Sequence, residues 1–108
     1  MLLALANNGD YSNRKNTQLM ELLGNREVFW VDAMGADDPE FNENFAEFAK
    51  DYPNLHIIEW EKIAVNHPEY IYADGVHIKG EGIDVYVDNV YNEIYSFYKN
   101  KIEKNVIL

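Results

Sequence analysis

Three short, largely apolar runs, each followed further along the chain by a helical pattern, constrain the fold of this chain most strongly. They lie at residues 2–6, 27–33 and 55–60. Apolar runs of this length are typical of strands that are buried on both faces. Strands that alternate with helices are typical of a parallel sheet with helices packed on its faces. The sequence therefore predicts an α/β fold.

Four segments carry helical signals. Residues 17–23 end at Gly24, residues 42–51 are amphipathic, and residues 61–65 are predicted to form a single turn. The last segment, residues 82–100, carries one broad apolar stripe: Ile83, Tyr86, Val87, Val90, Tyr91, Ile94, Phe97 and Tyr98. With 108 residues, the chain is predicted to be a single domain spanning residues 1–108.

Charge and composition exclude several classes of partner. Nine basic and nineteen acidic residues give a net charge of -10, which repels a phosphate backbone. We therefore predict no nucleic-acid partner. Cysteine is absent, so disulfides and thiolate metal ligands are excluded. The apolar runs are too short to cross a bilayer, and the first is too short for the core of a signal peptide, so we predict no membrane insertion by this chain.

The most informative motif is Asp74-Gly75-Val76-His77. An aspartate three residues before a histidine, on a loop that contains glycine, can place a carboxylate against one imidazole nitrogen and leave the other free as a base. The same residues could serve only in turn geometry. Together with His67 they could also hold zinc, but no helical spacing fixes such a set, and we predict no cofactor and no metal. His56 lies in a predicted strand and is expected to be structural.

Asn7 and Asn8 follow the first predicted strand and precede Gly9. A side-chain amide there could bind a developing oxyanion, or the pair could simply form an Asx-turn. Loops beyond the carboxyl ends of parallel strands share one edge of the sheet, so we expect this loop, the loop after Ala33 and the Asp74–His77 loop to meet. The only serines are Ser12 and Ser96, and neither sits in a glycine-rich turn after a strand.

In the order of its motifs, the chain resembles the C-terminal part of the SGNH/GDSL hydrolase superfamily. These motifs are the first strand with Asn7-Asn8-Gly9, then Val28-Phe29-Trp30-Val31-Asp32, His67-Pro68-Glu69-Tyr70, Asp74-Gly75-Val76-His77 and a helix that opens with Gly80-Glu81-Gly82. The likeness is greatest to the extracytoplasmic SGNH domain of acyltransferase-3 proteins, including peptidoglycan O-acetyltransferases. It implies a three-layer, flavodoxin-like parallel sheet that is truncated at its N-terminus. It also implies that Asn8 helps form the oxyanion hole, Asp74 is the orienting acid and His77 is the base. The implied substrate is an acyl ester, either a small molecule or an acylated carbohydrate, and the implied reaction is hydrolysis or O-acetyl transfer.

Two family blocks are not present in this sequence. One is the Gly-Asp-Ser block that carries the nucleophile, and the other carries the oxyanion-hole glycine; Ala6 also replaces a glycine usual in the asparagine block. The resemblance therefore implies that the chain alone does not turn over acyl esters. Residues 2–6 would be left with an open strand edge, so we expect association with an N-terminal segment or self-association. The alternative is a non-catalytic interaction module whose tyrosine-rich last helix packs on a partner.

Overall fold

The computed structural model describes residues 1–3, 11–35 and 39–106 of the chain. Strands and helices alternate along it, as the sequence predicts. The strands are β1 (Leu2–Leu3), β2 (Val28–Val31) and β3 (Leu55–Ile58). The helices are α1 (Asn13–Leu23), α2 (Phe41–Ala49), α3 (Glu61–Ala64), the short 3-10 helix η1 (Pro68–Tyr70) and α4 (Glu81–Val106).

The strands form a parallel sheet in the order β1-β2-β3. Phe29 of β2 pairs with Leu2 on one side and with His56 on the other. Residues 4–6 of the predicted first strand lie outside the described residues. Among the residues that are described, β1 therefore has a single neighbouring strand. The α/β prediction with a parallel sheet is confirmed.

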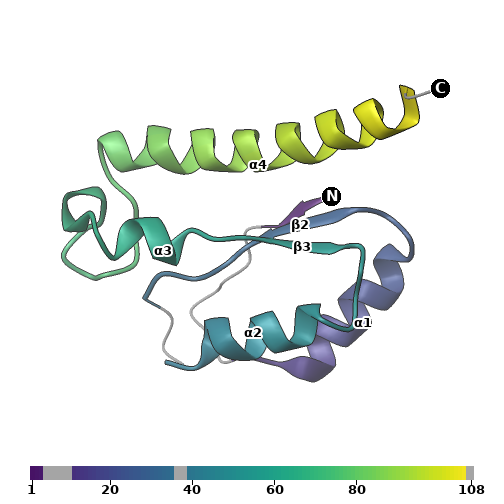
Figure 1. Cartoon of the computed structure of the whole chain (residues 1–108). Helices are drawn as coiled ribbons and strands as arrows, with labels where there is room; N and C mark the ends of the chain where they lie inside the picture. Colours follow the sequence, from purple (N-terminus) through teal and green to yellow (C-terminus); the bar gives the residue numbers. More distant parts are fainter. Residues whose placement is uncertain (4–10, 36–38, 107–108) are drawn as a thin grey trace.

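Helices lie on both faces of this sheet, with α1 and α2 on one face and α4 on the other (Figure 1). Successive side chains of a strand point to opposite faces, and β2 follows this rule. Val28 and Trp30 belong to the core shared with α1 and α2, whereas Phe29 and Val31 belong to the core covered by α4. All four residues are buried, which explains why the run is apolar throughout.

The core between the sheet and α2 is built from aromatic rings at helical spacing. Phe41, Phe45 and Phe48 are all buried on the inner face of α2. Phe45 is only 1% exposed, and its ring meets Trp30 edge-on with the ring centroids 4.8 Å apart. The apolar stripe of α2 is therefore what holds this helix against the sheet.

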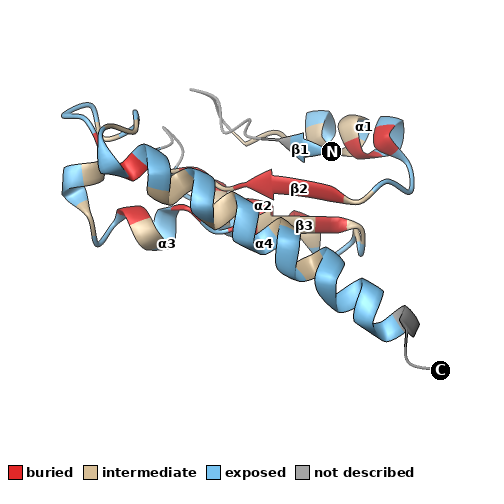
Figure 2. Ribbon diagram, turned by 90° about the horizontal axis from the view of Figure 1, so that it is seen from above, coloured by how far each residue is buried: buried red, intermediate tan, exposed pale blue. Residues whose placement is uncertain are grey.

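The core on the α4 side is centred on Phe29, Val31, Ile58, Trp60 and Ala64. The residues of α4 that pack against it are all half-buried: Val85, Tyr86, Val90, Ile94 and Phe97. Only this narrow side of α4 faces the sheet, and most of the helix surface is exposed (Figure 2).

Two helices extend by several residues beyond their predicted bounds. α1 begins at Asn13 because Ser12 caps it: the Ser12 hydroxyl oxygen accepts a hydrogen bond of 3.2 Å from the backbone N–H of Lys15. α4 continues to Val106, six residues past the predicted end, because residues 101–106 contain neither glycine nor proline. Within residues 1–3, 11–35 and 39–106, no helix has the length and apolar character needed to span a bilayer.

Candidate functional site

The loop that carries Asp74 and His77 is closed by backbone hydrogen bonds. Ile71 and Ile78 form an antiparallel bridge at its base. Above the bridge, the N–H of Tyr72 donates to the carbonyl of His77 at 2.8 Å, and the N–H of Gly75 donates to the carbonyl of Tyr72 at 2.9 Å. Gly75 has a φ of +75°, a conformation that favours glycine. The loop is therefore a defined turn with a fixed backbone.

Asp74 bonds both to its own turn and to His77. One carboxylate oxygen, Oδ1, accepts the backbone N–H groups of Val76 at 2.9 Å and of His77 at 3.0 Å. The other, Oδ2, lies 2.5 Å from Nδ1 of the His77 ring. The predicted contact between this carboxylate and this imidazole is thus present in the structure.

The second nitrogen of the His77 ring, Nε2, has no hydrogen-bond partner among the described residues. The His77 side chain is 75% exposed and that of Asp74 is 46% exposed, so the pair opens directly to solvent. An ionised Asp74 can only accept a hydrogen bond, so Nδ1 carries the proton and the lone pair lies on Nε2. This is the tautomer that a general base requires.

The Asp74–His77 loop touches the loop that follows β2. A Cβ atom placed on Gly35 would lie 2.2 Å from the carbonyl oxygen of Gly75 and 3.0 Å from a methyl group of Val76. Gly35 has a φ of +74°. The two backbones approach this closely only because Gly35 has no side chain. The predicted meeting of these two loops at the carboxyl end of β2 is confirmed.

Asn42 and Asp32, which no motif in the sequence singles out, hold the segment after β2 in place. The Asn42 side chain binds both backbone groups of Ala33: its Nδ2 donates to the carbonyl at 2.7 Å, and its Oδ1 accepts the N–H at 2.9 Å. Asp32 Oδ1 accepts the N–H groups of Trp60 at 2.7 Å and of Glu61 at 3.0 Å at the start of α3. Both contacts fix the backbone that leads into Gly35.

Burial changes the acidity of two side chains near the end of β2, Asp32 and Tyr86. Desolvation raises the pKa of Asp32 above its usual value, and the hydrogen bonds from Glu61 and Trp60 partly offset this. Desolvation also raises the pKa of Tyr86, and the negative charge of Asp32 adds to the effect. Because its Oδ1 accepts two backbone N–H groups, we assign Asp32 a structural role.

The other predicted residues have separate places. Asn8 lies outside the described residues. His67 Nδ1 lies 2.9 Å from Glu69 Oε1 and its ring stacks on Tyr70, and no cluster of three metal-ligating side chains occurs in the described ranges. His56 lies 2.5 Å from Glu27 and contacts Phe29 and Phe97, which agrees with its predicted structural role.

The contact with His77 sets the acidity of Asp74. The His77 side chain, and then the two backbone N–H groups, lower the pKa of Asp74 from 3.8 to about 2. Because the pKa is lowered in the folded chain, the contact favours the folded loop above about pH 3.8, and this contribution is lost as the pH falls toward 2.

We expect carbon-detected NMR titration of the Asp74 carboxyl group to give a midpoint of about 2. His77→Ala should move the midpoint back toward 3.8, because it removes the largest cause of the shift. Amide signals from α1 and α4, followed in the same titration, report whether the chain remains folded. A midpoint near 3.8 in the unmodified chain would show that the contact does not form in solution.

Sequence comparison relates the chain to proteins named O-acetyltransferases. It is 25% identical over 103 residues to the O-acetyltransferase OatA of Staphylococcus aureus strain NCTC 8325 / PS 47, a match that covers 94% of this chain and 17% of OatA. It is 29% identical over 92 residues to the candidate O-acetyltransferase SAS0844 of S. aureus strain MSSA476, covering 83% of this chain and 15% of that protein. No protein-family model matches the chain. The chain thus spans less than a fifth of the length of the relatives it matches.

Proposed function

We propose that the chain is part of an SGNH-type O-acetyltransferase or acyl-ester hydrolase, with His77 as the general base and Asp74 as the group that orients it. The observation that carries this proposal is the Asp74–His77 contact, with the second imidazole nitrogen open to solvent. The relation to proteins named O-acetyltransferases supports acetyl as the transferred group. An acylated carbohydrate is the proposed substrate.

In this proposal Nε2 of His77 takes the proton of a serine hydroxyl as the serine oxygen attacks the carbonyl carbon of an acyl ester. The carbonyl oxygen becomes an oxyanion, which the Asn8 amide and backbone N–H groups stabilise. When the tetrahedral intermediate collapses, the ester C–O bond breaks and His77 returns the proton to the departing alcohol. A second hydroxyl, from a carbohydrate or from water, then takes the acyl group by the same steps in reverse.

We further propose that the serine comes from a polypeptide segment outside residues 1–108. Ser12 caps α1, and Ser96 lies fifteen residues beyond the start of α4 at Glu81, on a helix that runs away from the loop (Figure 1). Neither serine bonds to His77. In the proposed whole domain, this segment adds a strand beside β1 and completes a three-layer, flavodoxin-like sheet. The parallel order β1-β2-β3 and the helices on both faces are compatible with that arrangement.

The test is to sequence the genomic DNA upstream of the codon for Met1 and to express the whole reading frame. We expect an in-frame segment that encodes a strand followed by Gly-Asp-Ser, and a product that reacts with a fluorophosphonate probe at that serine. The 108-residue chain alone should hydrolyse p-nitrophenyl acetate no faster than its His77→Ala variant. A reading frame without such a serine, or a product that the probe does not label, would refute the proposal.

A non-catalytic interaction module is the second candidate. The observation that favours it is that Asp74 Oδ1 already accepts two backbone N–H groups, so Asp74 has a structural role in its turn without any chemistry. In that case the His77 contact only stiffens the loop, and substitutions of His77 would leave every activity of the whole protein unchanged.

A further inference from the structure

Helix α4 has a second apolar face that is largely uncovered in the described part of the chain; of its residues, Tyr98 also meets the sheet, with its ring centroid 6.0 Å from that of Phe29. Six large hydrophobic side chains on it are between 41% and 61% exposed, and they recur every three or four residues. We call them the α4 stripe: Ile83, Val87, Tyr91, Tyr95, Tyr98 and Ile102. Positions three and four apart share one face of a helix, so the stripe is a continuous surface about 28 Å long at 1.5 Å per residue.

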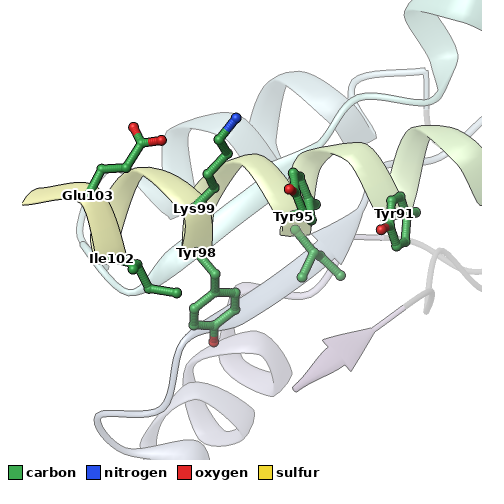
Figure 3. A pocket seen from close by; sticks show the side chains of 7 residues that line it. Tyr91, Tyr95, Tyr98, Lys99, Ile102 and Glu103 are labelled. Atoms are coloured by element: carbon green, nitrogen blue, oxygen red, sulfur yellow. The ribbon is translucent and has the colours of Figure 1, made fainter. Parts of the chain in front are cut away.

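The second half of the stripe borders a groove of about 570 Å³ (Figure 3). The rings of Tyr91 and Tyr95 stack there, with their planes 16° apart and their centroids at 5.8 Å. In the figure, Lys99 and Glu103 project from the helix on the side opposite to Tyr98 and Ile102. The groove is therefore apolar with a charged rim, which is the usual anatomy of a protein interface.

We propose that the α4 stripe binds the same stripe of a second copy of this chain, with the two α4 helices antiparallel. The spacing of the stripe favours such a pair. If Tyr91 lies opposite Tyr95 of the second copy, then Val87 lies opposite Tyr98 and Ile83 lies opposite Ile102. Every apolar side chain of the stripe then meets another one, as a two-fold symmetric interface requires.

The charges of α4 select the antiparallel direction. All charged residues in its first half are acidic: Glu81, Asp84, Asp88 and Glu93. Its second half carries three basic residues, Lys99, Lys101 and Lys104, and one acidic residue, Glu103. An antiparallel pair places the acidic half of one helix against the more basic half of the other. A parallel pair would place acid against acid. With a net charge of -10 per chain, association needs this local complementarity.

One ion pair follows from this register. Asp88 and Lys99 are both exposed. Lys99 borders the groove (Figure 3), and Asp88, three helical turns earlier, lies on the same side of α4. In the antiparallel pair, Asp88 of one copy faces Lys99 of the other, and the two-fold axis repeats the contact. Each single charge reversal therefore creates two repulsive contacts, whereas the double reversal restores two attractive ones.

Sedimentation equilibrium of the 108-residue chain at micromolar concentrations tests the proposal. The chain should have twice its 12.6 kDa monomer mass. Tyr95→Asp should weaken association about 100-fold or more, because it places a charge at the centre of the stripe. Asp88→Lys and Lys99→Asp should each weaken association about tenfold, and the Asp88→Lys/Lys99→Asp double variant should recover most of the loss.

The matched control is Leu22→Asp. Leu22 is an apolar residue of α1 that is 80% exposed and lies outside the stripe, so its replacement should leave the dimer intact. Circular dichroism of each variant establishes that it is folded. A folded monomer at all concentrations, a dimer that survives Tyr95→Asp, or a double variant as weak as the single ones would each refute the antiparallel pair. These outcomes do not depend on the serine or on His77, so they leave the proposed function to its own test.

Discussion

In the polypeptide that supplies the serine, Asp74→Asn is expected to lower the rate of acyl-ester hydrolysis by about 10²- to 10⁴-fold while the loop keeps its shape. The asparagine carbonyl oxygen can still accept the N–H groups of Val76 and His77, so the turn is preserved. Its amide NH₂ group then faces Nδ1 of His77 and donates to it. The ring must carry its proton on Nε2, where it cannot act as a base.

The measurement is the initial rate with p-nitrophenyl acetate, and His77→Ala should show a loss of similar size. The matched control is His67→Ala, because His67 binds Glu69 and Tyr70 and has no contact with Asp74. A structural role for the Asp74–His77 contact predicts a different pattern, in which both substitutions alter the stability of the loop and leave the rate within twofold. An unchanged rate in Asp74→Asn would therefore favour the interaction module.

Gly35→Ala is expected to reduce the free energy of unfolding by about 2–4 kcal/mol. Two effects add. A residue with a side chain resists the φ of +74°, and the new Cβ would lie 2.2 Å from the carbonyl oxygen of Gly75. One of the two loops must move, so the Asp74–His77 loop should separate from the carboxyl end of β2. Urea unfolding gives the free energy, and changes in the amide shifts of residues 72–78 report the displacement.

Gly80→Ala separates these two effects. Gly80 also has a positive φ, +55°, but a Cβ atom placed on it would have nothing within 4 Å. Its replacement should cost only the backbone strain, about 1–2 kcal/mol, and should leave the contact between the loops unchanged. Equal losses for the two substitutions, with no movement of residues 72–78 in Gly35→Ala, would show that the two loops are not in contact.

The elements that lie in the sheet and its helices could be predicted from the sequence because each shows its own periodicity. The uniform burial of β2 explains its unbroken apolar run, and the rings of α2 recur at helical spacing. The start of α1 was missed because Ser12 acts through a single hydrogen bond to Lys15, in a segment with no apolar pattern. Element bounds depend on such local contacts more than on periodicity.

The broad apolar stripe predicted on the last helix serves two faces in the structure. Its pattern indicates which residues are apolar, but not how much sheet lies beneath them. The structure divides these residues: Tyr86, Val90, Ile94 and Phe97 pack on the sheet, whereas the α4 stripe remains exposed. A small sheet cannot cover every apolar side chain of a 26-residue helix.

The Asp74–His77 contact was predictable because both residues lie on one short turn. The role of Asn42 was not, because its partner Ala33 is nine residues away and asparagine is common at helix starts for other reasons. Gly35 could be predicted only as a loop residue, since its importance depends on the approach of Gly75 from a distant part of the chain. Contacts of this kind depend on the tertiary fold.

The two tryptophans lie on opposite faces of the sheet, so the fluorescence of each reports on a different half of the core. Trp30 is 3% exposed on the α2 side of the sheet, and Trp60 is 2% exposed on the α4 side. Both rings are packed among apolar side chains, so the emission of each should shift to longer wavelengths once water enters. A variant that keeps only one of the two tryptophans reports the unfolding of one half of the core. Comparison of the two such variants shows whether both halves unfold together.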